Sequence, residues 1–273
     1  MNPRIALTIA GSDSSGGAGI QADLKTFSAL GVYGASVITA LTAQNTRGVT
    51  AIHDPPPEFV GAQIDAVFDD LAIDAVKIGM LSRKEVIDVV AERLAARDTA
   101  EGAPPIVLDP VMIAKSGAVL LREDAIAALR AKLLPMARIV TPNIPEAAAL
   151  TGLAEEDVAS APEHACERLA ALGSRAVVLK GGHVGGATSD DLLFDGKTFT
   201  RLPAPRVATK NTHGTGCTFS SAIAANLAKG MSVVDAVRAA KDYIERAIEA
   251  GVSLRIGSGH GPVHHFHAFW PRE

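Results

Sequence analysis

The sequence predicts a three-layer α/β/α fold, in which helices cover both faces of a mainly parallel central sheet. Short apolar runs alternate along the chain with longer segments whose apolar residues recur at three- and four-residue steps. The short runs are typical of buried strands, and the longer segments are typical of amphipathic helices. Because βαβ units produce this alternation, we expect a parallel sheet with both faces covered.

The predicted elements follow one another in a regular order. Strands are expected where apolar runs are bounded by glycine, proline or polar clusters: Ile5–Ala10, Ala35–Leu41, Ala75–Ile78, Ile106–Leu108, Ile139–Thr141 and Ala176–Leu179. Helices are expected where the helical period holds: Gly19–Leu30, Glu58–Leu71, Lys84–Ala96, Asp124–Leu133, Glu163–Leu172, Thr215–Lys229 and Val233–Ala250. A hairpin is expected from Asp190–Phe194 and Phe199–Leu202, since Asp195-Gly196-Lys197 between them supplies an Asp-Gly turn.

The length of 273 residues permits one large domain or two small ones. The clearest breaks, Pro55-Pro56-Pro57 and Glu101-Gly102-Ala103-Pro104-Pro105, are short and connect a helix with a strand. We therefore expect residues 1–273 to form a single domain.

Composition and charge exclude several classes of partner. Hydrophobic residues make up 48% of the chain and charged residues 21%, which is ordinary for a globular protein. The formal net charge of −4 supplies no basic field for nucleic acid. The apolar run Ile5–Ala10 is too short for a membrane span or a secretion signal. We expect a cytoplasmic protein that binds a small molecule, with neither nucleic acid nor membrane as a partner.

Polar and glycine-rich clusters follow the predicted strands. In open parallel sheets, ligands bind beyond the carboxyl ends of the strands. We therefore expect these clusters to converge at one rim: Gly11–Gly19, Gln44–Gly48, Gly79–Ser82, Asp109–Gly117, Asn143–Glu146 and Lys180–Gly186.

The first glycine cluster contains Gly17-Ala18-Gly19-Ile20-Gln21-Ala22, which matches the GxGxxG/A pattern of dinucleotide-binding proteins. That kind of site also needs an acidic residue about 20 positions further on, and Ala40–Thr46 contains none. Two interpretations remain. The glycines let a helix start close to the sheet, or the loop faces a ligand.

The strongest local motif is the turn that leads into the predicted helix Thr215–Lys229. Glycines permit successive N–H groups to point inward, and a helix N-terminus carries about half a unit of positive charge. We expect an anion hole that suits a transferring phosphoryl group, formed by Gly214, Thr215, Gly216 and Cys217. A simple helix cap by Thr212 or Thr215 is the alternative.

Cys217 lies in the first turn of the same predicted helix. We expect the helix dipole and nearby donors to lower the pKa of its thiol from the free value of about 8.5, which makes Cys217 a candidate base. A buried cysteine that serves only in packing is the alternative. Cys166 has no glycine neighbours and is assigned to packing.

Two acidic residues and a lysine are expected on the same rim. Asp109 ends one predicted strand, and Glu146 opens a helix after another. Together they suit a magnesium ion that is bound with a nucleotide, although capping by Asn143 explains Glu146 equally simply. Lys180 ends the strand before Gly181 and is placed to contact phosphate. A solvated lysine at a strand end is the alternative.

Taken together, these segments resemble the hydroxymethylpyrimidine/phosphomethylpyrimidine kinase family of thiamine biosynthesis, within the ribokinase-like superfamily. The resemblance spans nearly the whole chain. Many ribokinase-like enzymes have an aspartate where this chain has Cys217, so the cysteine narrows the resemblance to the pyrimidine kinases. The motifs that carry it are Ala10–Thr26, Thr39–Thr46, Lys77–Leu81, Leu108–Met112, Thr141–Glu146, Lys180–His183 and the turn that ends at Cys217.

The resemblance implies a reaction. The γ-phosphoryl group of ATP would pass to 4-amino-5-hydroxymethyl-2-methylpyrimidine, and a second would pass to the resulting monophosphate. ATP and Mg²⁺ would be the cofactors, with Asp109 and Glu146 as metal ligands, and the enzyme would be a homodimer. Lys180 and Cys217 would be catalytic, with Cys217 acting as base or as part of the anion hole.

The resemblance also implies binding residues on both sides of the reacting groups. The pyrimidine would be surrounded by Gly11, Asp23, Gln44, Met80 and Val111, with Asp23 and Gln44 supplying polar recognition. The nucleotide would be bound by Asn143, Lys180 and Thr212.

Two other functions compete with this one. A pyridoxal or pyridoxine kinase has the same fold and phosphorylates a hydroxymethyl group on a similar ring. A non-catalytic pyrimidine-binding regulator is disfavoured, because Asp109, Glu146, Lys180 and Cys217 are all present in one chain.

Overall fold

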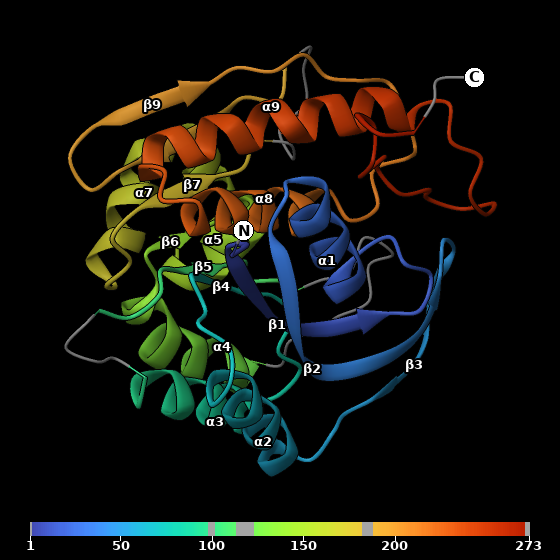
Figure 1. The fold of residues 1–273 in the computed structure, drawn as a ribbon. Helices are drawn as coiled ribbons and strands as arrows, with labels where there is room; N and C mark the ends of the chain where they lie inside the picture. The colour runs from blue at the N-terminus through green and yellow to red at the C-terminus, as the bar shows by residue number, and fades with distance from the viewer. Residues whose placement is uncertain (1, 98–101, 113–122, 182–187, 271–273) are drawn as a thin grey trace.

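The computed structural model describes residues 2–97, 102–112, 123–181 and 188–270, and Figure 1 shows the fold. Within these ranges nine strands form one sheet in the order β3-β2-β1-β4-β5-β6-β7-β8-β9. The central pairings from β2 to β7 are parallel, whereas the β2–β3, β7–β8 and β8–β9 pairings are antiparallel. The strands are β1 (Ile5–Asp13), β2 (Tyr33–Asn45), β3 (Gly48–His53), β4 (Ala75–Ile78), β5 (Ile106–Leu108), β6 (Ile139–Val140), β7 (Val177–Leu179), β8 (Asp191–Phe194) and β9 (Phe199–Leu202).

Helices cover both faces of the sheet, so the predicted three-layer α/β/α fold is confirmed. One core contains α1, α8 and α9, and the other contains the remaining helices (Figure 1). None of the helices in the described ranges is both long and apolar enough to cross a membrane. The helices are α1 (Gly19–Ala29), α2 (Pro57–Phe68), α3 (Lys84–Ala95), α4 (Glu123–Ala128), α5 (Ile144–Thr151), α6 (Glu155–Ser160), α7 (Pro162–Ala171), α8 (Thr215–Ala228) and α9 (Val233–Gly251).

Strand β4 carries an ionisable residue into the core. Val76 and Ile78 belong to the core on the α2 and α3 side, and Ala75 belongs to the core on the α1 and α8 side. Because side chains alternate along a strand, Lys77 points toward α1 and α8. Its side chain is completely buried.

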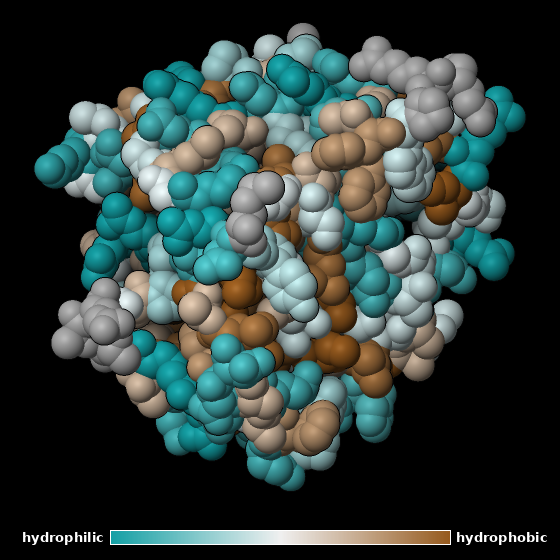
Figure 2. Space-filling view, in the orientation of Figure 1, coloured by the Kyte–Doolittle hydropathy of each residue, from teal (hydrophilic) through white to brown (hydrophobic). Residues whose placement is uncertain are grey.

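The structure extends the sequence prediction at one edge of the sheet. Strand β2 runs four residues beyond Leu41, the predicted end, to Asn45, and it pairs with the unpredicted β3. The residues of β3 are half-buried or exposed, so no apolar run marks this strand in the sequence. Figure 2 shows apolar side chains gathered over β2 on a mainly hydrophilic face. Tyr33, Leu41 and Ile52 are exposed on β2 and β3.

The helix expected to open at Glu146 is α5, which begins two residues earlier at Ile144, whereas α6 was missed. Helix α5 has only eight residues and α6 only six, so neither presents a long helical period. The expected helix Asp124–Leu133 is α4 followed by a π-helical turn, Leu129–Leu133. The predicted hairpin is confirmed, because β8 and β9 pair antiparallel on either side of the Asp-Gly turn.

Candidate functional site

The glycine loop after β1 packs directly against the turn before α8. A Cβ atom on Gly214 would collide with the backbone oxygen of Gly17. Gly214 also has a φ of 79°, in the left-handed region, so both its space and its backbone favour glycine. A Cβ on Gly17 would lie 2.5 Å from ring atom Cδ2 of His213. The two glycine motifs, at opposite ends of the sequence, therefore form one continuous site.

The N-terminus of α8 is not used in a side-chain cap. Gly214 occupies the cap position, and among the described residues no side chain caps the helix. The hydroxyl of Thr215 instead donates to the backbone oxygen of Thr212, at 2.8 Å. The capping alternative is therefore wrong for both threonines. The geometry supports an anion hole at this helix N-terminus.

Three charged side chains gather beside the same turn. Nζ of Lys180 lies 3.1 Å from Oδ1 of Asp109 and 3.7 Å from Oε2 of Glu146. A Cβ on Gly216 would lie 3.4 Å from this Nζ atom and 3.7 Å from Oδ2 of Asp109. Burial alone would lower the pKa of Lys180, but Asp109 and Glu146 outweigh it and raise that pKa. Lys180 therefore keeps a positive charge next to the turn that leads into α8.

Glu146 has both a structural and an electrostatic role. It forms a capping box with Asn143: its N–H donates to Oδ1 of Asn143, and its Oε2 accepts the N–H of Asn143. Burial, and after it the charge of Asp109, raise the pKa of Glu146 despite the opposing effect of Lys180. A second cation at this place would favour the charged carboxylate. Two carboxylates are hard oxygen donors, so Asp109 and Glu146 fit a magnesium ion.

The thiol of Cys217 is not activated, which corrects the expectation from the helix dipole. Burial raises the pKa of Cys217 to about 11, and it outweighs the lowering effect of the Lys77 ammonium group. The charges of Asp23 and Asp109 raise the pKa further, whereas a hydrogen bond from the backbone of Gly19 lowers it. At neutral pH the thiol is therefore protonated. It is a hydrogen-bond donor and not a ready base.

This protonation state predicts slow alkylation. Iodoacetamide should label Cys217 slowly near pH 7, and the rate should rise about tenfold per pH unit without a plateau up to about pH 9.5, because only the thiolate reacts. Mass spectrometry of the Cys217 peptide measures the rate. Free cysteine, assayed in parallel, should level off near pH 8.5. An early plateau for Cys217 as well would contradict the raised pKa.

A buried ion pair underlies Cys217. Both carboxylate oxygens of Asp23 contact Nζ of Lys77, at 3.0 and 2.9 Å, and both side chains are completely buried. The hydroxyls of Thr8 and Ser221 each donate to Asp23 at 2.6 Å. Both carboxylate oxygens of Asp23 therefore already have hydrogen-bond partners within the protein. Its expected role in recognising the ring stays a prediction.

Sequence reasoning missed Lys77 as a site residue. The available signal was a lysine in the otherwise apolar strand Ala75–Ile78, since lysine is almost never fully buried unless it is paired. Burial would lower the pKa of Lys77, but the charges of Asp23 and Asp109 raise it. The ammonium group is thus a fixed positive charge that interacts electrostatically with Cys217 at the start of α8.

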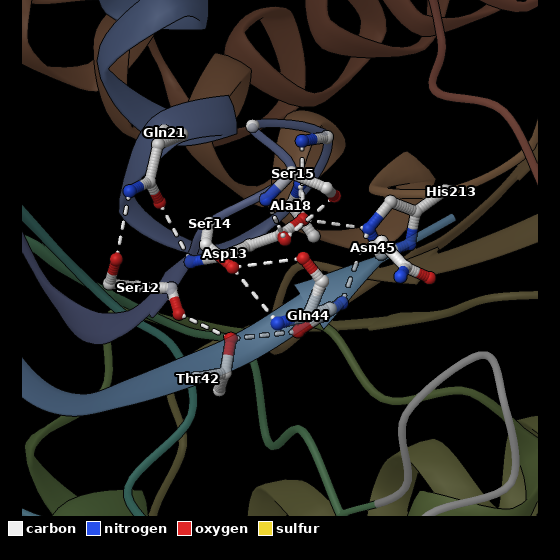
Figure 3. Close-up of polar contacts among 12 residues, drawn as sticks. Ser12, Asp13, Ser14, Ser15, Ala18, Gln21, Thr42, Gln44, Asn45 and His213 are labelled. Carbon is white, nitrogen blue, oxygen red and sulfur yellow. Dashed lines mark hydrogen bonds and ion pairs between the residues drawn. The ribbon is translucent and has the colours of Figure 1, made fainter. Parts of the chain in front are cut away.

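Of the other residues expected to surround the acceptor, Gly11, Gln44 and Met80 lie along the glycine loop. A Cβ on Gly11 would lie 2.6 Å from Cε of Met80, so these two residues are neighbours. Gln44 exchanges two 2.9 Å hydrogen bonds with Ser14 through its backbone, and its side chain points toward His213 (Figure 3). The N–H of Val111 donates to the backbone oxygen of Asp109.

The polar clusters therefore converge at one rim, as expected, in the parts that the structure describes. Asn143 completes the set through a parallel bridge to Lys180. The ends of two clusters, at 113–117 and 182–186, lie outside the described residues.

This arrangement agrees with the family to which the sequence can be matched. A family model described as phosphomethylpyrimidine kinase matches residues 13–264. The chain belongs to this family. A hydroxymethylpyrimidine/phosphomethylpyrimidine kinase from Rhizobium meliloti (strain 1021) is 59% identical over 266 residues, which cover 97% of this chain and 98% of the relative.

Solved structures of similar kinases have the same fold as this chain. A phosphomethylpyrimidine kinase from Clostridium difficile 630 has a TM-score of 0.76 at 46% identity, covering 89% of this chain and 99% of its own. A pyridoxal kinase from Staphylococcus aureus, in complex with AMP-PCP and pyridoxal, has a TM-score of 0.87 at 33% identity, covering 98% and 96%. The phosphomethylpyrimidine kinase fold is thus shared with kinases that act on another ring.

Proposed function

We propose that this chain transfers the γ-phosphoryl group of ATP to the hydroxymethyl group of hydroxymethylpyrimidine, and then a second phosphoryl group to the monophosphate, in thiamine biosynthesis. One observation carries the proposal. The acceptor-side loop and the turn Gly214–Cys217 are in backbone contact, beside the Lys180–Asp109–Glu146 cluster. An acceptor alcohol and a phosphoryl group bound there would lie next to each other.

The protein contributes mainly position and charge to this reaction. The alcohol oxygen forms a bond to the γ-phosphorus while the bond to the ADP oxygen breaks, and charge develops on the phosphoryl oxygens. N–H groups at the start of α8 and the ammonium group of Lys180 stabilise that charge. Cys217, with its raised pKa, acts as a neutral donor in the anion hole. The alcohol proton leaves with the product phosphate or to solvent.

The nucleotide side of the site needs a cation. Magnesium bound with ATP supplies positive charge to the phosphates, and Asp109 and Glu146 are the residues that would hold it. Asn143, Lys180 and Thr212 are proposed to contact the nucleotide. Gly11, Gln44, Met80 and Val111 are proposed to surround the acceptor ring.

We also propose that the enzyme is a cytoplasmic homodimer. The exposed Tyr33, Leu41 and Ile52 on β2 and β3 support an interface at this edge of the sheet, because apolar side chains gathered on a surface favour association.

A side-by-side kinetic assay tests the function. With ATP and Mg²⁺, the purified protein should convert hydroxymethylpyrimidine to the mono- and then the diphosphate, with kcat/KM on the order of a hundredfold above that for pyridoxal, because a polar pocket rejects a ring lacking its partner groups. Phosphate-31 NMR identifies both products. Efficient pyridoxal phosphorylation without either pyrimidine product would replace this function by the second candidate, which the similarity to the Staphylococcus aureus enzyme favours.

A further inference from the structure

Asp13, the last residue of β1, ties the glycine loop to the turn before α8 (Figure 3). Its Oδ1 accepts the N–H and the hydroxyl of Ser15, at 2.8 and 2.7 Å. Its Oδ2 accepts the N–H groups of Gly17 and Ala18, at 3.1 and 2.8 Å, and contacts Nε2 of His213 at 2.7 Å. Burial acts to raise the pKa of Asp13, but the hydrogen bonds from His213 and Ser15 lower it to about 2. Asp13 is therefore a carboxylate at neutral pH.

The charge of Asp13 determines which nitrogen of His213 carries a proton. An ionised carboxylate only accepts hydrogen bonds. At 2.7 Å, Nε2 of His213 must therefore carry a hydrogen and donate it to Oδ2 of Asp13. The same nitrogen then has no lone pair for another donor.

The side-chain amide of Gln44 lies between His213 and Thr42 (Figure 3). Its Nε2 is 3.4 Å from Nε2 of His213, which places two N–H donors face to face. Its Oε1 is 3.0 Å from Oγ1 of Thr42. That hydroxyl has one hydrogen, and the backbone oxygen of Ser12, at 2.8 Å, can only accept it. On the Thr42 side, two acceptors therefore face each other.

One rotation resolves both conflicts. Amide oxygen and nitrogen are nearly the same size, so their partners decide which is which. Turning the Gln44 amide by 180° places its NH₂ group against the lone pairs of Thr42 and its oxygen against the N–H of His213. The Thr42 contact then joins a donor to an acceptor. On the other side the amide oxygen shares the single Nε2 hydrogen that His213 donates to Asp13, so two donors no longer face each other.

We propose that Asp13 and His213 are positioning residues that hold the Gln44 amide with its nitrogen toward Thr42 and its oxygen toward His213. The inference rests on the proposed function, which places Gln44 against the acceptor ring. The amide retains one N–H and one oxygen lone pair for a ligand. The N–H can donate to a ring nitrogen while the oxygen accepts from a neighbouring amino group, as on the edge of an aminopyrimidine. A pyridine without the amino group can make only the first of these two hydrogen bonds.

Kinetics of three variants test the positioning. His213→Phe removes the N–H that faces the amide, and Thr42→Val removes the hydroxyl that accepts from it, while His213→Gln keeps an N–H donor for Asp13. The first two should raise the KM for hydroxymethylpyrimidine by about tenfold, which is the effect of losing one well-placed hydrogen bond. The KM for ATP should stay within about twofold, and the preference for hydroxymethylpyrimidine over pyridoxal should fall. His213→Gln should recover most of the loss.

A matched control separates this role from damage to the strand. Thr50 lies on β3, and its hydroxyl donates to the backbone oxygen of Ala43, one residue from Gln44. Thr50→Val removes a hydroxyl from the same strand pair without touching the amide, so its KM values should match those of the wild type. Unchanged KM and substrate preference in Thr42→Val would overturn the inference, even if His213→Phe does not fold.

The protonation of His213 provides an independent measurement. Nitrogen-15 NMR of histidine-labelled wild-type protein should show a hydrogen on Nε2 of His213, and a hydrogen on Nδ1 alone would overturn the inference. Failure of the proposed function can be distinguished from failure of this inference, because in the first case the wild-type protein itself would not phosphorylate hydroxymethylpyrimidine.

Discussion

Replacing Lys180 with methionine should lower kcat by on the order of 10²- to 10³-fold, the size of effect expected when one preorganised group that stabilises the transition state is removed. Methionine preserves much of the length of the side chain but not its charge. The substitution removes the ammonium group that faces Gly216, and it leaves Asp109 and Glu146 without the cation that they share. The remaining like charges would repel the phosphoryl group that the anion hole is expected to receive.

Steady-state kinetics with both substrates varied will separate kcat from the two KM values. Lys197→Met is the matched control, because Lys197 is an exposed lysine in the β8–β9 turn, and its kcat should equal that of the wild type. Circular dichroism of Lys180→Met checks that the fold is intact. A kcat within about threefold of the wild type would exclude Lys180 from phosphoryl transfer.

Breaking the buried Lys77–Asp23 pair should produce the largest loss of stability. Lys77→Met or Asp23→Asn should each lower the free energy of unfolding by about 3–5 kcal/mol, because each leaves a partner charge in the core without its counterion. Asp23 would still accept bonds from Thr8 and Ser221, but these hydroxyls do not replace a positive charge. The measurement is urea denaturation of each variant.

The double variant Lys77→Met/Asp23→Asn distinguishes pairing from packing. It removes both charges together, so it should be more stable than the sum of the two single losses predicts. Glu163→Gln is the control, because it breaks a surface pair with Arg201 whose side chains are 42% and 67% exposed. That change should cost at most about 1 kcal/mol. Additive losses in the double variant would show that the two charges do not stabilise each other.

Much of the fold could be predicted because its signals are local. Apolar runs such as Ile5–Ala10 identify buried strands without knowledge of their partners, and an Asp-Gly turn identifies the β8–β9 hairpin. Strand β3 lacked such a signal, since it lies at the sheet edge and buries none of its residues fully.

The sequence was enough to predict which residues of the site lie close together, but not the protonation state of Cys217. Glycine motifs and strand ends placed Lys180, Asp109 and Gly216 at one rim. The pKa of Cys217 depends on the balance between burial and several charges from distant segments, and sequence spacing shows none of these. The pairing of Lys77 with Asp23 likewise joins residues 54 positions apart.

The contact between Asp13 and His213 joins residues 200 positions apart. During synthesis on the ribosome, β1 emerges early, but the loop that follows it has no partner until the segment before α8 emerges. Contacts of such high sequence separation form slowly, because the entropy of closing a long loop must be overcome first. Packing of the glycine loop against the turn before α8 should therefore be among the last steps of folding, and a nascent chain that stops before α8 would lack this contact.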